Sequence, residues 1–313
     1  MVSNNTTTVK QYNPDEITLF YQAYIAIWVI VGLTAFVLNI LQIIFIVKKS
    51  LNQRNTRVGN SVIFLTSLCM SDGLVGFVMV ILIVVIFLLP ERHKSTSIDL
   101  IFLFLEGSSI ISILNLVGIT VDRLWCVMKP IQYRNSSRKY AVCICVSLWV
   151  LALLIISVVV HLYAIRGFYI SLSVYVIIMP CLIFSTCALL CCCYLLIWQR
   201  LIKNRHTLES GNNQDTNEIA ETLKRERQTA LTLREKKLTK ISTLIIVTFA
   251  ICWLPLAGLY ILARYNYINM EHIKLIMIFQ LLATLNSVAN PLLYLGAMKK
   301  RMERLCYGVR IQC

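Results

Sequence analysis

The chain has 313 residues, of which 58% are hydrophobic and only 14% are charged. Soluble domains are about half apolar and about a quarter charged, so this composition excludes an ordinary globular or disordered protein. The formal net charge of +15 lies mostly between apolar stretches, which indicates membrane topology and argues against a nucleic-acid partner.

Seven apolar stretches follow in chain order, and each is longer than the roughly 20 residues that a helix needs to cross a membrane. They cover residues 21–47, 61–89, 98–128, 140–163, 169–198, 238–263 and 273–298. Backbone groups in lipid must form their hydrogen bonds within the segment, so each stretch is expected to be a helix. The sequence thus predicts an all-α membrane protein, with a seven-transmembrane helix bundle over residues 21–298.

Lysines and arginines gather on one side of these predicted helices. Of the 30 in the chain, 24 lie in or beside the first, third and fifth loops and the tail, and 6 lie on the other side. The positive-inside rule therefore places residues 1–20 outside the cell, and the loop 199–237 and the tail 299–313 in the cytosol. Two glycosylation sequons, at Asn4 and Asn5, fall on the outer side.

Polar side chains occur inside the predicted spans, where ionisable groups are costly and face the bundle interior or water. Asp72 lies in the second span and Glu106 in the third, and Asp122 precedes Arg123 near the inner end of the third span. Hydroxyl and amide side chains are frequent in the third and seventh spans. A polar seam between the second, third and seventh helices would satisfy all of these groups.

Short motifs, one in each span, then follow a recognisable order. They are Asn39, Leu68 with Asp72, Asp122-Arg123-Leu124, Trp149, Pro180, Phe249-x-x-Cys252-Trp253-Leu254-Pro255 and Asn290-Pro291-Leu292-Leu293-Tyr294. Each motif is weak alone, but seven in order are specific. The chain resembles a rhodopsin-like (class A) G-protein-coupled receptor over nearly its whole length.

The resemblance implies an allosteric sodium site. The residues that match it are Asp72, Ser112, Asn286, Ser287 and Asn290, with Asn39 and Trp253 close by. One carboxylate with hydroxyls and amides supplies the oxygen ligands that a hard cation prefers. The alternative is a water-filled polar network without a specific ion. No other cofactor is expected.

The resemblance also implies a switch that meets the G protein. Arg123 matches the family's switch arginine, held at rest by Asp122 and by Glu235 at the inner end of the sixth helix, and Tyr294 belongs to the same switch. Breaking these contacts would free Arg123 as the sixth helix swings outward. The alternative is that these groups are solvated charges near the membrane surface.

A packing relay is implied between the ligand and this switch. Ile113, Pro180 and Phe249 match its members, below Trp253, and Pro255 removes a backbone hydrogen bond in the sixth helix and is expected to kink it. The alternative is that these are ordinary core residues.

Position alone suggests a set of ligand-binding residues. They are Phe102, Glu106, Ser109, Trp253, Leu256, Tyr260, Gln280 and Thr284. Leu105 stands where aminergic receptors place an aspartate, which argues against a classical biogenic amine. The neighbouring Glu106 shares one helical face with Ser109 and Ile113. It is either a counter-ion for the ligand or an acid kept neutral by burial and bonded to a neighbouring helix.

The basic segment 299–305 carries Met302 and Leu305 on one side, which predicts a short amphipathic eighth helix on the membrane surface. Cys306 and Cys313 are candidates for palmitoylation there, so membrane lipid is an expected partner.

These features predict a plasma-membrane receptor that couples an extracellular ligand of unknown class to heterotrimeric G proteins. The sequence has no set of nucleophile, base and oxyanion donors and no P-loop signature, so it does not predict an enzyme. A transporter would show repeated halves and discontinuous helices, which the sequence lacks. The other alternative is a receptor-like binding protein that does not couple, since Leu124 and Ala188 replace tyrosines common in the family.

Overall fold

The computed structural model describes residues 14–52, 60–88, 90–166, 168–210, 243–262 and 270–310. This part of the chain is almost entirely helical and contains no strand. Its helices are α1 (Pro14–Asn52), α2 (Asn60–Leu88), α3 (Glu91–Met128), the short α4 (Pro130–Asn135), α5 (Arg138–Arg166), α6 (Phe168–Ser210), the helix 243–262 and α8 (Met270–Arg310).

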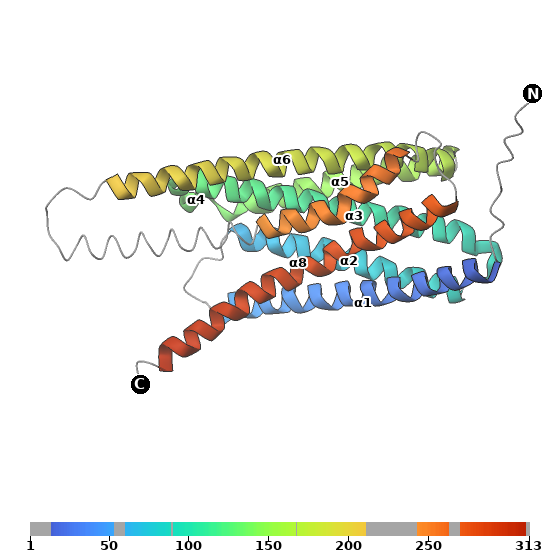
Figure 1. The fold of residues 1–313 in the computed structure, drawn as a ribbon, viewed down its shortest axis with the longest axis horizontal. Coiled ribbons are helices and arrows are strands. Elements are labelled where there is room, and N and C mark those ends of the chain that lie inside the picture. The colour runs from blue at the N-terminus through green and yellow to red at the C-terminus, as the bar shows by residue number, and fades with distance from the viewer. Residues whose placement is uncertain are drawn as a thin grey trace, which may run out of the picture.

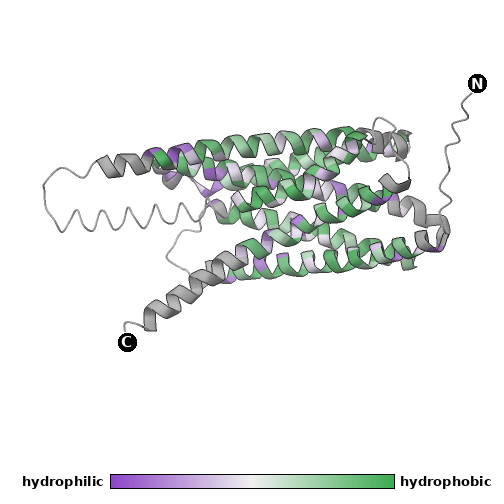
Figure 2. Ribbon diagram, viewed as in Figure 1, coloured by the Kyte–Doolittle hydropathy of each residue, from purple (hydrophilic) through white to green (hydrophobic). Residues whose placement is uncertain are grey.

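Seven helices in the described part are long and apolar enough to cross a membrane, which confirms the predicted fold. Their candidate spans are Thr18–Lys48, Val62–Leu82, Asp99–Met128, Arg138–Ile165, Val176–Arg200, Thr243–Leu262 and Ile273–Tyr294. The helices run side by side along the long axis of the molecule (Figure 1). Hydrophobic residues cover most of their length, and hydrophilic residues gather at the end where α4 lies (Figure 2).

The spans differ greatly in how much of their surface the bundle covers. In the most apolar window of each span, 71% of the α3 residues are buried but only 17% of the α5 residues. The α3 helix packs against α2, α5 and α6, whereas α5 presents most of its surface outward. The many polar residues of α3 are therefore shielded from lipid, as their number predicts.

Helices α1 and α2 approach each other through backbone contacts at two glycines. A Cβ atom added to Gly76 would lie 2.5 Å from the carbonyl oxygen of Gly32 and 2.6 Å from the backbone nitrogen of Phe36. Small residues allow such close packing between membrane helices. This approach brings Asn39 of α1 and Asp72 of α2 into the same buried region, where both side chains are fully enclosed.

The end of α8 differs from the sequence-based expectation. The helix continues without interruption from Met270 to Arg310, and it extends beyond the bundle in one direction (Figure 1). A separate eighth helix is therefore not confirmed. Gly296 and Gly308 are the poorest helix formers after Pro291, and a single glycine costs too little to end a helix of good formers.

Candidate functional site

Asp72 lies at the centre of a buried polar cluster formed by three helices. Its carboxylate is fully enclosed and accepts hydrogen bonds from the Ser112 hydroxyl of α3, from the Ser287 hydroxyl of α8 at 3.0 Å and from the Asn290 amide of α8 at 2.9 Å. Asn39 adds α1 to the cluster as a fourth helix, because its amide donates to the Ser287 carbonyl at 3.0 Å. We call these residues, together with Asn286, the Asp72 cluster.

Several oxygens of the Asp72 cluster remain available as acceptors. The side-chain oxygens of Asn39, Asn286 and Asn290 are buried and have no hydrogen-bond partner among the described residues. Buried polar atoms are normally satisfied by protein, water or an ion. Because hydroxyl oxygens can donate and accept at once, Ser112 and Ser287 also keep lone pairs beside the carboxylate. The donor set therefore fits a hard monovalent cation or a group of waters.

A second hydrogen-bond chain connects the same region to α5. The Trp149 indole N–H donates to the Ser67 hydroxyl at 2.9 Å, and Ser67 donates to the Asn115 side-chain oxygen at 2.6 Å. The Asn115 amide in turn lies 3.5 Å from the Ser71 hydroxyl, next to Asp72 in the chain. These hydrogen bonds tie α5 to α2 and α3, and they satisfy the buried polar groups of Ser67 and Asn115.

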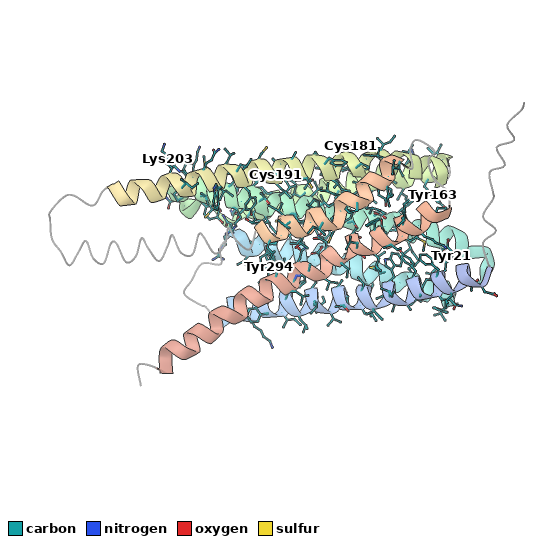
Figure 3. All side chains as sticks on the ribbon, in the orientation of Figure 1. Tyr21, Tyr163, Cys181, Cys191, Lys203 and Tyr294 are labelled. Atoms are coloured by element: carbon teal, nitrogen blue, oxygen red, sulfur yellow. The ribbon has the colours of Figure 1, made fainter. Side chains whose placement is uncertain are left out.

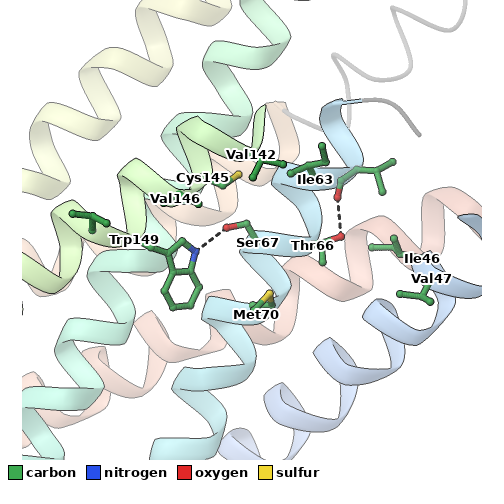
Figure 4. A pocket seen from close by; sticks show the side chains of 12 residues that line it. Ile46, Val47, Ile63, Thr66, Ser67, Met70, Val142, Cys145, Val146 and Trp149 are labelled. Atoms are coloured by element: carbon green, nitrogen blue, oxygen red, sulfur yellow. Dashed lines mark hydrogen bonds between the residues drawn. The ribbon is translucent and has the colours of Figure 1, made fainter. Parts of the chain in front are cut away.

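An apolar groove of about 600 Å³ opens beside this chain, between α1, α2 and α5 (Figure 4). Its lining includes Ile46, Ile63, Met70 and Trp149, and it shares no residue with the predicted sodium or ligand sites. The nearby Thr66 hydroxyl is bonded to the Val62 carbonyl of its own helix at 2.8 Å. With so little polar surface, the groove suits lipid hydrocarbon.

At the α4 end of the bundle, Arg123 is held by the acid that precedes it. One guanidinium nitrogen of Arg123 lies 2.9 Å from Asp122 Oδ2, and the side chains are 14% and 3% exposed. The Tyr133 hydroxyl of α4 donates to both Asp122 oxygens, at 3.0 and 3.2 Å. Tyr133 also packs edge-on against Trp125, with ring centroids 5.4 Å apart. The short helix α4 therefore helps to position the ion pair.

Nearer the opposite end, three helices meet through Gln280. Its amide nitrogen donates to Glu106 Oε1 of α3 at 2.6 Å, and its carbonyl oxygen accepts from the Tyr260 hydroxyl of the helix 243–262 at 2.9 Å. Gln280 and Tyr260 are buried, and Glu106 is half-buried. We call this arrangement the Glu106 chain. By contrast, Ser109 and Thr284 bond to carbonyls of their own helices.

Side chains pack densely along the whole bundle (Figure 3), and beside the Asp72 cluster an apolar core lies between the Glu106 chain and the α4 end. Ile113, Phe249, Trp253 and Leu256 belong to one buried core cluster with Tyr260. The rings of Phe249 and Trp253 have centroids 6.2 Å apart. The core thus joins Tyr260 by continuous packing to the half of the helix 243–262 that lies nearer α4.

The three prolines in the spans do not interrupt their helices. Pro180 and Pro291 are buried inside α6 and α8, and Pro255 is half-buried within the helix 243–262. The helical conformation continues through each position, so any local change in direction occurs without a break.

Comparison with known proteins addresses the class of this molecule. Residues 38–294 match the family described as 7 transmembrane receptor (rhodopsin family). The chain belongs to the rhodopsin family of seven-transmembrane receptors. Adenosine receptor A3 of Bos taurus is 26% identical to it over 317 residues, covering 93% of this chain and 90% of the relative. Adenosine receptor A3 of Ovis aries is also 26% identical, covering 90% and 87%.

Membership in this family confirms that the chain is a receptor and not an enzyme. Four of the five predicted sodium-site residues, Asp72, Ser112, Ser287 and Asn290, are joined by hydrogen bonds, and the fifth, Asn286, is buried beside Ser287 in the sequence. The Asp122–Arg123 pair is formed. Glu235, Asn4, Asn5 and Cys313 lie outside the described residues, as do the side chains of Phe102 and Cys306. Their predicted roles stay predictions.

Two residues that sequence reasoning missed now have a place in the receptor. Tyr133 bonds to Asp122 from a helix that was not predicted, and the only signal was its closeness in the chain to Arg123. Tyr194 of α6 lines a small cavity with Thr120 and Phe249, about two turns from Ala188, which lacks the family's tyrosine hydroxyl. The signal in the sequence was that Tyr194 follows Ala188, the position of the expected tyrosine, by less than two helical turns.

Proposed function

We propose that this receptor lies in the plasma membrane with its N-terminus outside and converts binding of an extracellular ligand into activation of heterotrimeric G proteins. The observation that carries the proposal is the Asp122–Arg123 ion pair at the α4 end, which is partly exposed and supported by Tyr133. The guanidinium is held by the acid that precedes it on the same helix, so a contact from the G protein could compete for it without unfolding α3. The excess of basic residues on this side supports its cytosolic location.

Activation is proposed to be a population shift between two packings of the bundle. The ligand acts near the Glu106 chain, and the helix 243–262 moves outward at the α4 end. Glu106 and Arg123 are 17 residues apart on α3, which corresponds to about 26 Å along the helix. Continuous packing through Trp253 and Phe249 supports transmission over this distance.

We further propose that a sodium ion favours the resting packing by binding at the Asp72 cluster. Asp72, Ser112, Asn286, Ser287 and Asn290 would hold it, and the unbonded oxygens of Asn286 and Asn290 support this assignment. A bound cation would balance the charge of a carboxylate that is otherwise enclosed in the bundle. The alternative, a cluster satisfied by water alone, predicts no preference for sodium over other monovalent cations.

The direct test of coupling is guanine-nucleotide exchange on a panel of purified G proteins. Arg123→Ala should remove exchange, whereas Arg138→Ala, at the start of α5 and outside the ion pair, should keep it. Adenosine is the first ligand to apply, because both reported relatives are named adenosine receptors. Exchange that is absent under every ligand would favour a receptor-like protein that binds but does not couple, as Leu124 and Ala188 suggest.

Glycosylation at Asn4 and Asn5 and palmitoylation at Cys306 and Cys313 complete the proposal. Removal of glycans by an amidase should shift the mobility of the full chain and not that of an Asn4→Gln/Asn5→Gln variant. Incorporation of an alkyne-labelled palmitate should fall when both cysteines are replaced by serine.

A further inference from the structure

Gln42 of α1 is a buried polar residue that the proposed mechanism does not use. Its side chain is 1% exposed, and neither its amide nitrogen nor its amide oxygen has a hydrogen-bond partner among the described residues. Asn39 and Asn290 differ from it, because each leaves only its oxygen unbonded while its nitrogen donates to another helix. Buried amides normally find partners, so the unbonded state of Gln42 requires an explanation.

Gln42 lies where α1 packs against α2 and α8. It follows Asn39 by three residues, and residues three apart share one face of a helix. Since Asn39 contacts α8 from this face, the fully enclosed Gln42 faces the same interior. The α1 helix runs toward the α4 end of the bundle (Figure 1), so Gln42 lies one turn nearer that end than Asn39.

The α8 helix is weakened where α1 contacts it. Pro291 has no backbone N–H, so the carbonyl of Ser287, four residues earlier, has no donor within the helix. The Asn39 amide donates to that carbonyl instead, at 3.0 Å. Prolines are where helices most readily change direction. A bend at Pro291 would move the following turns of α8 relative to α1, and so change what Gln42 can reach.

An enclosed amide without partners destabilises the packing that encloses it, because its contacts with water are lost and not replaced. The Asp122–Arg123 pair is formed, so the structure corresponds to the resting packing of the proposed mechanism. The penalty at Gln42 therefore falls on the resting packing. A second packing in which the amide is bonded avoids that penalty.

Given the proposed receptor function, on which this inference rests, we infer that Gln42 biases the receptor toward its active packing, where its amide gains hydrogen bonds that the resting packing does not provide. Its partners there are polar groups of α8, or waters beside them, which come within reach when that helix bends at Pro291. Because Gln42 is enclosed, it acts on the equilibrium between packings without touching the G protein. It is a positioning residue.

Gln42→Leu in the purified full chain tests this inference with three measurements. The melting temperature should rise by about 2 °C or more, because the resting packing loses an unbonded amide. Basal guanine-nucleotide exchange, at equal receptor amounts, should fall about fivefold as the active packing becomes rarer. Hydrogen–deuterium exchange in residues 243–262, the helix that the mechanism moves, should slow.

Two further variants control for the change of side chain. Asn39→Leu makes the same kind of substitution one turn away, at an amide that is bonded to the Ser287 carbonyl. It should lower the melting temperature, the opposite sign, because that carbonyl then loses its donor. Gln42→Met keeps an unbranched side chain of similar length. It should act in the same direction as Gln42→Leu, which separates loss of the amide from a poor fit of the branched leucine.

A lower melting temperature in both Gln42→Leu and Gln42→Met would overturn the inference, since it would mean that the amide is satisfied at rest, for example by an enclosed water. Higher melting temperatures with unchanged hydrogen–deuterium exchange in residues 243–262 would also overturn it, because the effect of Gln42 would then be structural alone. If the wild type shows no basal nucleotide exchange, slower hydrogen–deuterium exchange in both variants would support the inference and count against the proposed coupling alone.

Discussion

The Asp72 cluster and the Glu106 chain are both polar sites inside an apolar bundle, but they are built differently. Asp72 is fully enclosed and receives hydrogen bonds from two neighbouring helices, with Asn39 of α1 bonded alongside. The Glu106 chain passes through one amide side chain and begins at a half-buried acid. The first arrangement fixes helices in place, whereas the second is suited to rearrangement by a small molecule.

The largest expected effect comes from disturbing the packing that supports the Asp72 cluster. Gly76→Val places side-chain atoms against the backbone of Gly32 and Phe36, so α1 and α2 must separate. Overpacking costs about 1–3 kcal/mol, and the displaced Asn39 contact adds to it. We expect a strong loss of folded receptor, measured by size-exclusion yield and by melting temperature.

Gly258→Ala is the matched control for that substitution, because an added Cβ meets no atom within 4 Å. It should leave yield and melting temperature close to those of the wild type. A Gly76→Val receptor as stable as the control would show that the close approach of α1 and α2 does not support the cluster.

A smaller effect is expected from neutralising the acid itself. Asp72→Asn should keep the fold, since an amide retains hydrogen-bond partners, but it should abolish the rise in melting temperature caused by sodium. A ligand at about 100 times its Kd stabilises by about 2.7 kcal/mol, which sets the scale of that rise. Titration with sodium chloride, compared with choline chloride at equal ionic strength, measures it.

Asp99→Asn is the control, since Asp99 lies outside the cluster and near Tyr163. Sodium sensitivity that survives in Asp72→Asn would leave the water-filled network as the better account.

The smallest effect is expected from a substitution in the Glu106 chain that leaves the Asp72 cluster unchanged. Tyr260→Phe keeps the buried ring and removes the hydroxyl that donates to Gln280, so stability should fall by about 1 kcal/mol. The sodium-dependent rise in melting temperature should remain as in the wild type. Loss of that rise would mean that the Glu106 chain and the Asp72 cluster form one site.

The fold and the Asp72 cluster could be predicted because the apolar stretches are long and the motifs occur in a specific order. Each span is an apolar stretch that only a helix can satisfy in lipid, and the structure describes seven. Asp72 and Asn290 sit in motifs whose order is specific, and a costly buried acid requires partners on neighbouring helices.

The Glu106 chain and the α4 contacts were less accessible to sequence reasoning. Glu106 was expected either to serve the ligand or to bond to a neighbouring helix, but helical periodicity could not name Gln280 as the partner. Contacts between helices depend on their rotation and depth, which apolar sequence leaves undetermined. Tyr133 was missed because α4 has only six residues and no apolar period.

The proposed mechanism requires that the Glu106 chain controls Arg123, which lies about 26 Å away along α3. Basal guanine-nucleotide exchange on a G-protein panel tests it directly, with the wild type, Gln280→Leu and Gln280→Leu/Arg123→Ala compared at equal receptor amounts. Breaking the chain at Gln280 should raise exchange, and adding Arg123→Ala should abolish the rise. Exchange by Gln280→Leu equal to that of the wild type on every G protein, or a rise that persists without Arg123, would show that the Glu106 chain does not control Arg123.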